Sequence, residues 1–258
     1  MLMVLAVGSV NAQDLNADQD KYMFNHLGGS ISFGTDGIGI ELATPITPYV
    51  NMRAGVSFYP KINVTVKDID YTITGKSGKG KVEASFQKID GKLLFDAYPF
   101  GLKNSFHVTA GLFIGRKNII TASFIEDPTA PIGAGINKTL DNGEQWIVEA
   151  DPNTHAIDLR VRTNAVKPYV GIGFGRAIPK KRVNVACDIG VQFQGKPKLD
   201  GYASLTTMSG VSNKWVQLES NDFHFDESFN KDVDKAFDIS NKVVVWPVLN
   251  IRVTGRFF

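Results

Sequence analysis

The chain has 258 residues, including 25 glycines and 11 prolines, and its formal net charge is +2. This length suffices for one large all-β domain, and a charge so near balance gives no indication of a nucleic-acid partner. No apolar run reaches the length of about 18 residues that a transmembrane helix needs, so none is predicted. The single cysteine, Cys187, excludes an internal disulfide framework, and we interpret it as a small apolar strand residue.

The N-terminus resembles a secretory signal peptide. Residues 1–10 are apolar, and Val10-Asn11-Ala12 offers compact residues for cleavage after Ala12. The basic segment that usually precedes the apolar core is missing, which indicates a truncated chain or a misplaced start; the alternative interpretation is a buried N-terminal strand. We therefore expect a signal peptide at 1–12, a polar lead at 13–26 and a single β-barrel domain at 27–258.

Apolar and polar residues alternate with a period of two along most of that domain, which predicts an antiparallel sheet with one apolar face. Asp36-Gly37 is a strong hairpin turn. We expect an up-and-down barrel of about ten strands, with eight or twelve as alternatives, at 27–33, 38–42, 49–59, 82–98, 105–114, 157–162, 169–175, 182–195, 198–205 and 243–258.

The connections differ in length. Three long polar segments, 61–80, 122–150 and 208–242, are expected as loops at one end of the barrel. With ten strands, short connections at 44–48, 99–104, 164–167 and 195–197 all fall at the other end. Long loops outside and short periplasmic turns are typical of outer-membrane barrels. Asp36-Gly37 and Ala177–Lys181 are exceptions, because they are short and yet fall at the loop end.

The decisive question is whether the apolar face points inward, as in a soluble barrel, or outward to lipid. The polar face combines many glycines with charged residues, and inside a narrow barrel small residues make room for large charged ones. The apolar face carries almost no mid-strand charge, which at the bilayer midplane would cost about 2–4 kcal/mol for Arg or Lys. We therefore predict that the polar residues face the lumen; the candidates are Glu41, Arg53, Asp96, His107, Asp158, Arg160, Asp188, Arg252 and Arg256.

Aromatic residues gather near the ends of the expected strands, as in an interfacial girdle. They are Phe58, Tyr59, Tyr98, Phe100, Trp246, Phe257 and Phe258.

Four segments together resemble a family of uncharacterised Gram-negative outer-membrane β-barrel proteins. They are Leu94–Phe100 (LFDAYPF), Pro168–Gly173 (PYVGIG), Asp188–Pro197 (DIGVQFQGKP) and the C-terminal Pro247–Leu249 with Gly255–Phe258. The resemblance implies an outer-membrane barrel and no particular activity. It also implies that the barrel-assembly machinery reads a terminal aromatic residue on the apolar face. Here Phe257 has that parity and Phe258 does not, so the signal is shifted by one residue.

Features that could carry chemistry are weak. Ser105 and His107, with Asp96 on the preceding strand, lie on the polar face rather than on the lipid-facing face where barrel hydrolases work. The Gly171–Gly175 segment alternates at strand period and is interpreted as lumen packing rather than a nucleotide loop. The acidic segment 222–240 is a candidate amphipathic helix that could cap or plug the barrel, and the spacing around His224 matches no established metal loop. No catalytic residue, metal or cofactor is predicted.

The sequence thus predicts a porin-like outer-membrane barrel that acts either as a narrow polar pore for small solutes or as a structural or interaction barrel. The alternatives are an outer-membrane lipid-modifying enzyme and a secreted soluble barrel that binds a hydrophobic ligand. The expected partners are outer-membrane lipid, the assembly machinery through the C-terminal strand, and a protein partner at the long loops; none is a nucleic acid.

Overall fold

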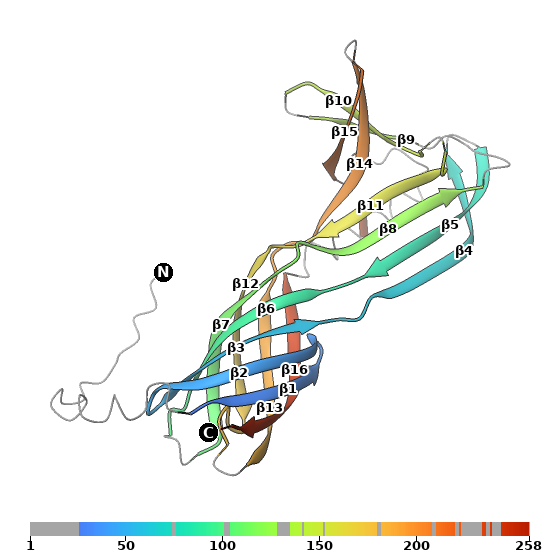
Figure 1. Ribbon diagram of the computed structural model, residues 1–258. Helices are drawn as coiled ribbons and strands as arrows, with labels where there is room; N and C mark the ends of the chain where they lie inside the picture. The colour runs from blue at the N-terminus through green and yellow to red at the C-terminus, as the bar shows by residue number, and fades with distance from the viewer. Residues whose placement is uncertain are drawn as a thin grey trace.

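The computed structural model describes residues 26–73, 76–100, 104–127, 135–140, 142–151, 153–179, 182–207, 210–219, 222, 234–235, 238 and 244–257. In these ranges the chain forms sixteen β-strands in two sheets, one closed into a barrel and one extending from its rim (Figure 1). No described helix is both long and apolar enough to cross a membrane. The predicted signal peptide at 1–12 and all but the last residue of the lead at 13–26 lie outside the described residues.

Eight antiparallel strands close the barrel. In order around the wall they are β1 (Gly28–Gly34), β2 (Gly37–Thr47), β3 (Val50–Phe58), β6 (Ile89–Ala97), β7 (Phe106–Gly115), β12 (Val166–Phe174), β13 (Val183–Phe193) and β16 (Val245–Arg256). Closure comes from pairing of β1 with β16 along the whole of β1, from Gly28 opposite Arg256 to Gly34 opposite Asn250. The predicted all-β class and antiparallel barrel are confirmed.

The second sheet continues five barrel strands beyond the rim. Its strands are β4 (Ile62–Ile73), β5 (Lys76–Phe86), β8 (Asn118–Glu126), β11 (Ala156–Arg162), β14 (Lys198–Thr207), β10 (Gln145–Glu149) and β9 (Gly135–Thr139), with β15 (Gly210–Leu218) paired to β14. Short junctions join them to the barrel at 59–61, 87–88, 116–117, 163–165 and 194–197. Backbone hydrogen bonds cross the junctions, for example from Thr163 N–H to Lys117 O at 2.8 Å, so the two sheets form one continuous wall.

Apolar side chains of the barrel point outward and polar side chains point inward. On β12 every second residue from Val166 to Phe174 is exposed, and the residues between them that carry side chains are buried. Ile40, Ile172 and Ile251 are each about half exposed, whereas Asp96, His107 and Arg252 have no exposed surface. The orientation is that of a barrel with an apolar exterior, and it contradicts the alternative of a soluble barrel with an apolar interior.

The barrel has eight strands rather than about ten, because two expected barrel strands, 157–162 and 198–205, belong to the second sheet. The alternative of eight strands is therefore the observed one. Parts of the expected loops 61–80, 122–150 and 208–242 are strands β4, β5, β8, β9, β10 and β15. Of the helix candidate 222–240, only residues 222, 234, 235 and 238 are described.

The eight-strand topology also changes which connections lie at which end of the barrel. The segments 164–167 and 195–197 are not turns, because the chain runs straight through them from one sheet to the other. The turns at 48–49 and 98–105 and the connection at 175–182 lie at the end away from the second sheet (Figure 1). Ala177–Lys181 is therefore no exception, and Asp36-Gly37 is the one short turn at the rim among those discussed.

The expected aromatic girdle is partly wrong. Tyr98 is completely buried, and Trp246 is half-buried inside the barrel, where it stacks on Phe86 with ring centroids 6.4 Å apart. At the short-turn end, however, Phe106 packs against both Phe100 and Phe174, and all three belong to the outer surface of the wall. Aromatic residues thus form a cluster on the β7–β12 side of the barrel at this end, with membership different from that predicted.

The second sheet has its own apolar core, separate from the barrel interior. Trp146 and Val148 of β10 pack on Ile157, Ala203, Val216 and Leu218, with Ile136 of β9 completing the cluster. This core holds β9 and β10 against the sheet, so the sheet is a folded unit and not a set of independent loops.

We expect Trp146→Ala to loosen the second sheet and leave the barrel intact, because Trp146 is buried only in the sheet's core. The truncation should cost about 3–5 kcal/mol of local stability. Amide hydrogen exchange should accelerate in β9, β10, β14 and β15 but not in β3, β7 or β12. Tyr202→Ala, on the opposite face, is the control, and equal acceleration in the barrel strands would show that the two units unfold together.

Candidate functional site

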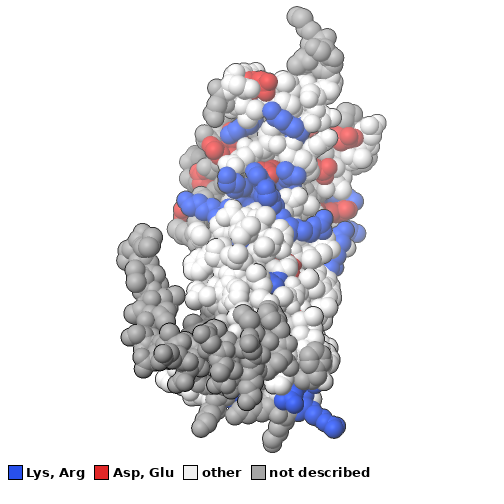
Figure 2. Space-filling model, turned by 60° about the vertical axis from the view of Figure 1, so that its left-hand side comes forward, with Lys and Arg blue, Asp and Glu red and all other residues white. Residues whose placement is uncertain are grey.

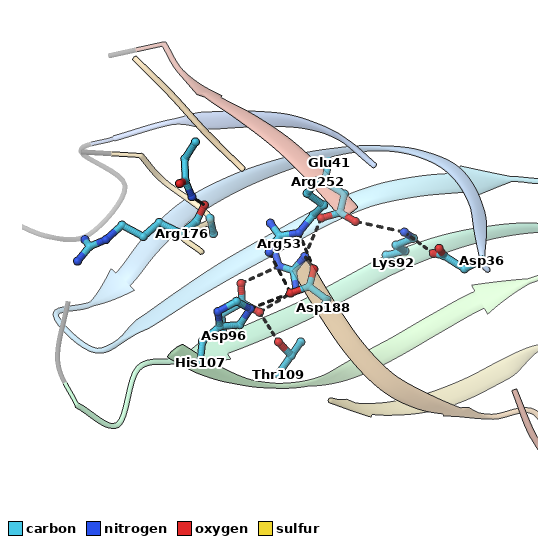
Figure 3. A network of polar contacts seen from close by, with 12 residues as sticks. Asp36, Glu41, Arg53, Lys92, Asp96, His107, Thr109, Arg176, Asp188 and Arg252 are labelled. Atoms are coloured by element: carbon cyan, nitrogen blue, oxygen red, sulfur yellow. Dashed lines mark hydrogen bonds and ion pairs between the residues drawn. The ribbon is translucent and has the colours of Figure 1, made fainter. Parts of the chain in front are cut away.

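A network of charged side chains fills the barrel interior, with Arg53 of β3 at its centre (Figure 3). Arg53 Nη1 lies 3.0 Å from Glu41 Oε2 and 3.4 Å from Asp188 Oδ2. Its Nε and Nη2 lie 2.7 and 2.9 Å from the two carboxylate oxygens of Asp96. One guanidinium therefore joins carboxylates from β2 and β6, the two neighbours of β3 in the wall, with a carboxylate from β13 on the opposite side of the barrel.

Asp188 of β13 is the second centre of the network. Arg252 of β16 donates to it through Nε at 2.6 Å and Nη2 at 3.2 Å, a bidentate pair. His107 of β7 meets the same carboxylate through Nε2 at 2.8 Å, and its Nδ1 lies 3.3 Å from the backbone oxygen of Ser105. Both ring nitrogens of His107 are thus occupied.

Lys92 extends the network toward the rim. Its Nζ lies 3.2 Å from Glu41 Oε1 and 2.6 Å from Asp36 Oδ2 in the β1–β2 turn. Thr109 Oγ1 of β7 donates at 2.7 Å to Asp96, its cross-strand neighbour on β6. With these two residues, six of the eight barrel strands and one turn contribute a side chain to the network.

A second charged cluster lies nearer the rim, around Asp90 at the start of β6. Lys167 Nζ is 2.7 Å from Asp90 Oδ1, and Lys88 Nζ is 3.4 Å from Asp90 Oδ2. Gln192 bridges the same groups, because it accepts from Lys88 at 2.8 Å and donates to Asp90 at 3.3 Å. Lys88 also lies 4.7 Å above the centre of the Trp246 ring.

The charges that the described residues place inside the barrel balance. The buried acidic residues among them are Asp36, Glu41, Asp90, Asp96 and Asp188, and the buried basic residues are Arg53, Lys88, Lys92, Lys167 and Arg252. None of these side chains is more than 5% exposed. Buried ions are tolerated only when they are paired and hydrogen-bonded, and this lumen meets that requirement with five charges of each sign.

Glycine on the wall makes room for the network. A Cβ on Gly173 of β12 would lie 2.4 Å from Asp188 Oδ1 and 2.5 Å from His107 Nε2. Gly55 would similarly meet the side chain and backbone of Glu41. The glycines of the polar face therefore have the role expected from the sequence, which is to leave space for larger residues on neighbouring strands.

Tyr98 closes the short-turn end of the lumen. Its ring lies 5.4 Å from the ring of His107, and its hydroxyl oxygen accepts a hydrogen bond from the Ala177 N–H at 3.1 Å.

The structure brings six of the nine predicted lumen residues together inside the barrel: Glu41, Arg53, Asp96, His107, Asp188 and Arg252. Asp158 and Arg160 lie elsewhere, because β11 belongs to the second sheet. There Asp158 accepts from Ser123, and Arg160 pairs with Asp200 at 3.0 Å. Arg256 is exposed at the end of β16, where the chain leaves the wall.

Sequence reasoning missed several members of the network. Asp90 and Lys92 share the parity of Asp96 on one strand, and Lys167 shares the parity of Tyr169, so the alternation already placed them on the polar face. The sequence predicts Asp36 in a hairpin turn and not in the lumen. The only signal that could have found Asp36 is the charge balance of the interior.

Other candidates for chemistry stay apart from this site. The Ser105 residue of the suspected hydrolase motif is exposed, while His107 is buried against Asp188. Among the described residues, no group of three or more His, Cys, Asp or Glu side chains could hold a metal ion. Cys187 is exposed on the apolar outer face, and no disulfide involves it.

No protein-family model and no curated protein matches the chain, so the family resemblance stays a prediction. Crystal structures of CarO2 and CarO from Acinetobacter baumannii are each 18% identical, with a TM-score of 0.49. They cover 90% and 89% of this chain and 98% and 97% of their own. A major outer membrane protein from Thermus thermophilus is 15% identical, with a TM-score of 0.32, and covers 90% of this chain and 98% of its own. Similarity at these values gives no basis for assigning a function to this chain.

We expect Arg53→Met to destabilise the barrel by about 3–5 kcal/mol, because it leaves three buried carboxylates without their shared partner. Arg116→Met is the matched control, since the exposed side chain of Arg116 bonds, among the described residues, only to the side chain of Gln87. Urea unfolding of the refolded proteins, followed by tryptophan fluorescence, measures the difference. Equal midpoints for the two variants would mean that the network adds nothing to stability.

Proposed function

We propose that this chain is an outer-membrane β-barrel with a closed lumen, which anchors and displays the second sheet outside the membrane. The observation that carries the proposal is the outward orientation of the apolar side chains. Ile31, Ile40, Val108, Ile172 and Ile189 stand on five different strands, and each is exposed by more than a third. A monomeric soluble protein would not expose so continuous an apolar surface.

Closure of the sheet supports a membrane location for the same surface. All eight strands of the barrel pair on both sides, so no backbone edge is left without hydrogen bonds, as lipid requires. On the face that Figure 2 shows, the described middle of the barrel is almost free of charge, and Lys and Arg gather where the second sheet begins. The short turns then face the periplasm and the second sheet faces outward. The C-terminal strand β16, which closes the barrel, is the segment that we expect the assembly machinery to engage.

The filled lumen favours a structural or interaction barrel over an open pore. Asp96, His107, Lys167 and Arg252 have no surface that water can touch, although they belong to four different strands. An open pore would wet these polar side chains. The narrow interior of an eight-stranded barrel is just wide enough to be filled by side chains.

The second sheet offers the surface that a protein partner would meet. A hollow of about 460 Å³ lies on it between the β10 and β14–β15 segments, with Ile147, Tyr202 and Val211 exposed at its wall. Polar residues Glu149 and Ser204, joined by a hydrogen bond of 3.0 Å, stand beside them. Mixed apolar and polar lining of this kind is typical of interaction surfaces.

The same geometry supports the view that the barrel is not an enzyme. The His107 ring is bonded to a carboxylate and a backbone oxygen, and it has no exposed surface from which it could reach a lipid. A general base must lie within hydrogen-bond reach of its substrate.

A narrow polar path is the second candidate, and one observation favours it. Buried side-chain oxygens of Ser32, Ser57, Asn250 and Thr254 have no hydrogen-bond partner in the described part of the chain. Buried polar groups usually find a partner, which is often water. A file of water along β1, β3 and β16 would then be the route for a small solute, with Arg53 as its constriction.

We expect Val170→Arg to weaken the lipid-embedded barrel by about 2–4 kcal/mol, the cost of an Arg at the bilayer midplane. Val170 is 46% exposed, at the centre of β12 between Ala110 and Val191. Unfolding by urea in phospholipid vesicles gives the difference. Val211→Arg in the second sheet is the control, since Val211 is exposed but lies beyond the rim. If both substitutions have the same small effect, the outer face of the barrel does not meet lipid.

We expect the purified protein to insert into a planar bilayer without discrete conductance steps. Arg252→Ala combined with Asp188→Ala removes two large side chains and no net charge, so steps should appear in this variant. Insertion is checked separately by protease protection of the barrel. If the unaltered protein shows conductance steps and this variant changes them, the result would contradict the closed barrel and support the narrow polar path.

A further inference from the structure

A basic hollow lies at the rim, where three neighbouring strands pass from the barrel into the second sheet. The junctions 116–117, 163–165 and 194–197 lie side by side there, joined by Thr163 N–H to Lys117 O at 2.8 Å and by Asn164 N–H to Gln194 O at 2.9 Å. The hollow between them has a volume of about 400 Å³. It is a feature of the junctions, because neither sheet alone would form it.

Four cations and no carboxylate line the hollow: Lys117, Arg162, Lys196 and Lys198. Arg162 pairs with Asp200 at 2.9 Å, and this carboxylate is shared with Arg160. Lys117, Lys196 and Lys198 form no ion pair with any described residue, in contrast to the lysines inside the barrel. Like charges gathered without a counterion repel one another, so the cluster favours an anion as its partner.

The hollow borders the apolar outer surface of the barrel. Val166, which belongs to its lining, is 50% exposed at the start of β12. On the neighbouring strands Ile114 and Phe193 occupy the last outward positions before the rim, and they are 54% and 43% exposed. The cations therefore stand directly at the upper border of the apolar barrel surface, as Figure 2 shows for the band of Lys and Arg as a whole.

We infer that this hollow binds the phosphate of a membrane lipid whose acyl chains lie along β7, β12 and β13. The inference rests on the proposed membrane location of the barrel. A phosphate carries the negative charge and the acceptor oxygens that Lys and Arg bind well, and the lipid interface is where basic residues attract anionic headgroups. The apolar strands beside the hollow favour a lipid over a free phosphate ion, because only a lipid has acyl chains that can pack on them.

The test uses the full chain refolded in detergent micelles and titrated with diphosphoryl lipid A, with the bound lipid counted by native mass spectrometry. The variant carries Lys117→Gln, Lys196→Gln and Lys198→Gln, which are exposed side chains outside both cores. The control carries Lys79→Gln, Lys81→Gln and Lys214→Gln in the second sheet, and so loses the same charge. Each basic side chain near an anionic headgroup contributes about a fivefold factor, so the variant should bind at least about tenfold more weakly while the control binds as the unaltered protein does.

Two outcomes would overturn the inference. One is equal affinity of the variant and the unaltered protein for lipid A. The other is complete displacement of the lipid by inorganic phosphate at a matched concentration, which would mean that the hollow recognises the ion alone. A folded barrel is recognised independently by its altered mobility on an unheated SDS gel. A chain that fails to fold in micelles therefore contradicts the proposed function, whereas a folded variant that still binds lipid contradicts only this site.

Discussion

The whole barrel depends on one constraint, which is that successive side chains of a strand point to opposite faces. Once the apolar residues point outward, every large polar residue between them enters a lumen that is only one or two side chains wide. The lumen therefore holds several charged side chains close together, among them Arg53, Lys92, Asp96 and Arg252. Desolvated charges are stable only in pairs. The balance of five acidic and five basic residues is the consequence, and the glycines at 55 and 173 supply the room.

Such a network is not the most stabilising way to fill a barrel. Each buried ion loses several kcal/mol of hydration, roughly, and well-packed apolar residues of similar volume often give equal or greater stability. What the network adds is a penalty against every wrong register. A slip of one residue would turn Arg53 or Asp188 to the apolar outside and an isoleucine or valine into the lumen. Arg53 also joins strands far apart in the sequence, from Glu41 to Asp188, so it favours one closure of the wall.

The barrel and the second sheet share strands but not a core. Along β3–β4, β7–β8 and β13–β14 the backbone continues, while the buried side changes from ion pairs to the cluster around Trp146 and Val148. The junctions are where the two patterns meet, and irregular residues such as Gly195, with its φ of +75°, occur there. Lys117, Lys196 and Lys198, which form no ion pair with a described residue, lie at this border, because the apolar exterior and the two cores would all disfavour an unpaired charge. The proposed anchoring, display and headgroup binding would thus all depend on one continuous wall.

The alternation of residues alone determined the all-β class, the antiparallel barrel and the polar face that holds Glu41, Arg53, Asp96, His107, Asp188 and Arg252. The face to which each residue of a strand points is set by local alternation, and it does not depend on which strand the segment pairs with. Local patterns do not state which strands pair with each other, however, and β11 and β14 alternate as clearly as any barrel strand. Only the tertiary structure decided that the barrel closes with eight strands, that Asp158 and Arg160 leave the lumen, and that Asp36 and Lys167 enter it. The physical reason is that closure and ion pairing join residues more than a hundred positions apart, as with Arg53 and Asp188, and no local pattern encodes such a distance.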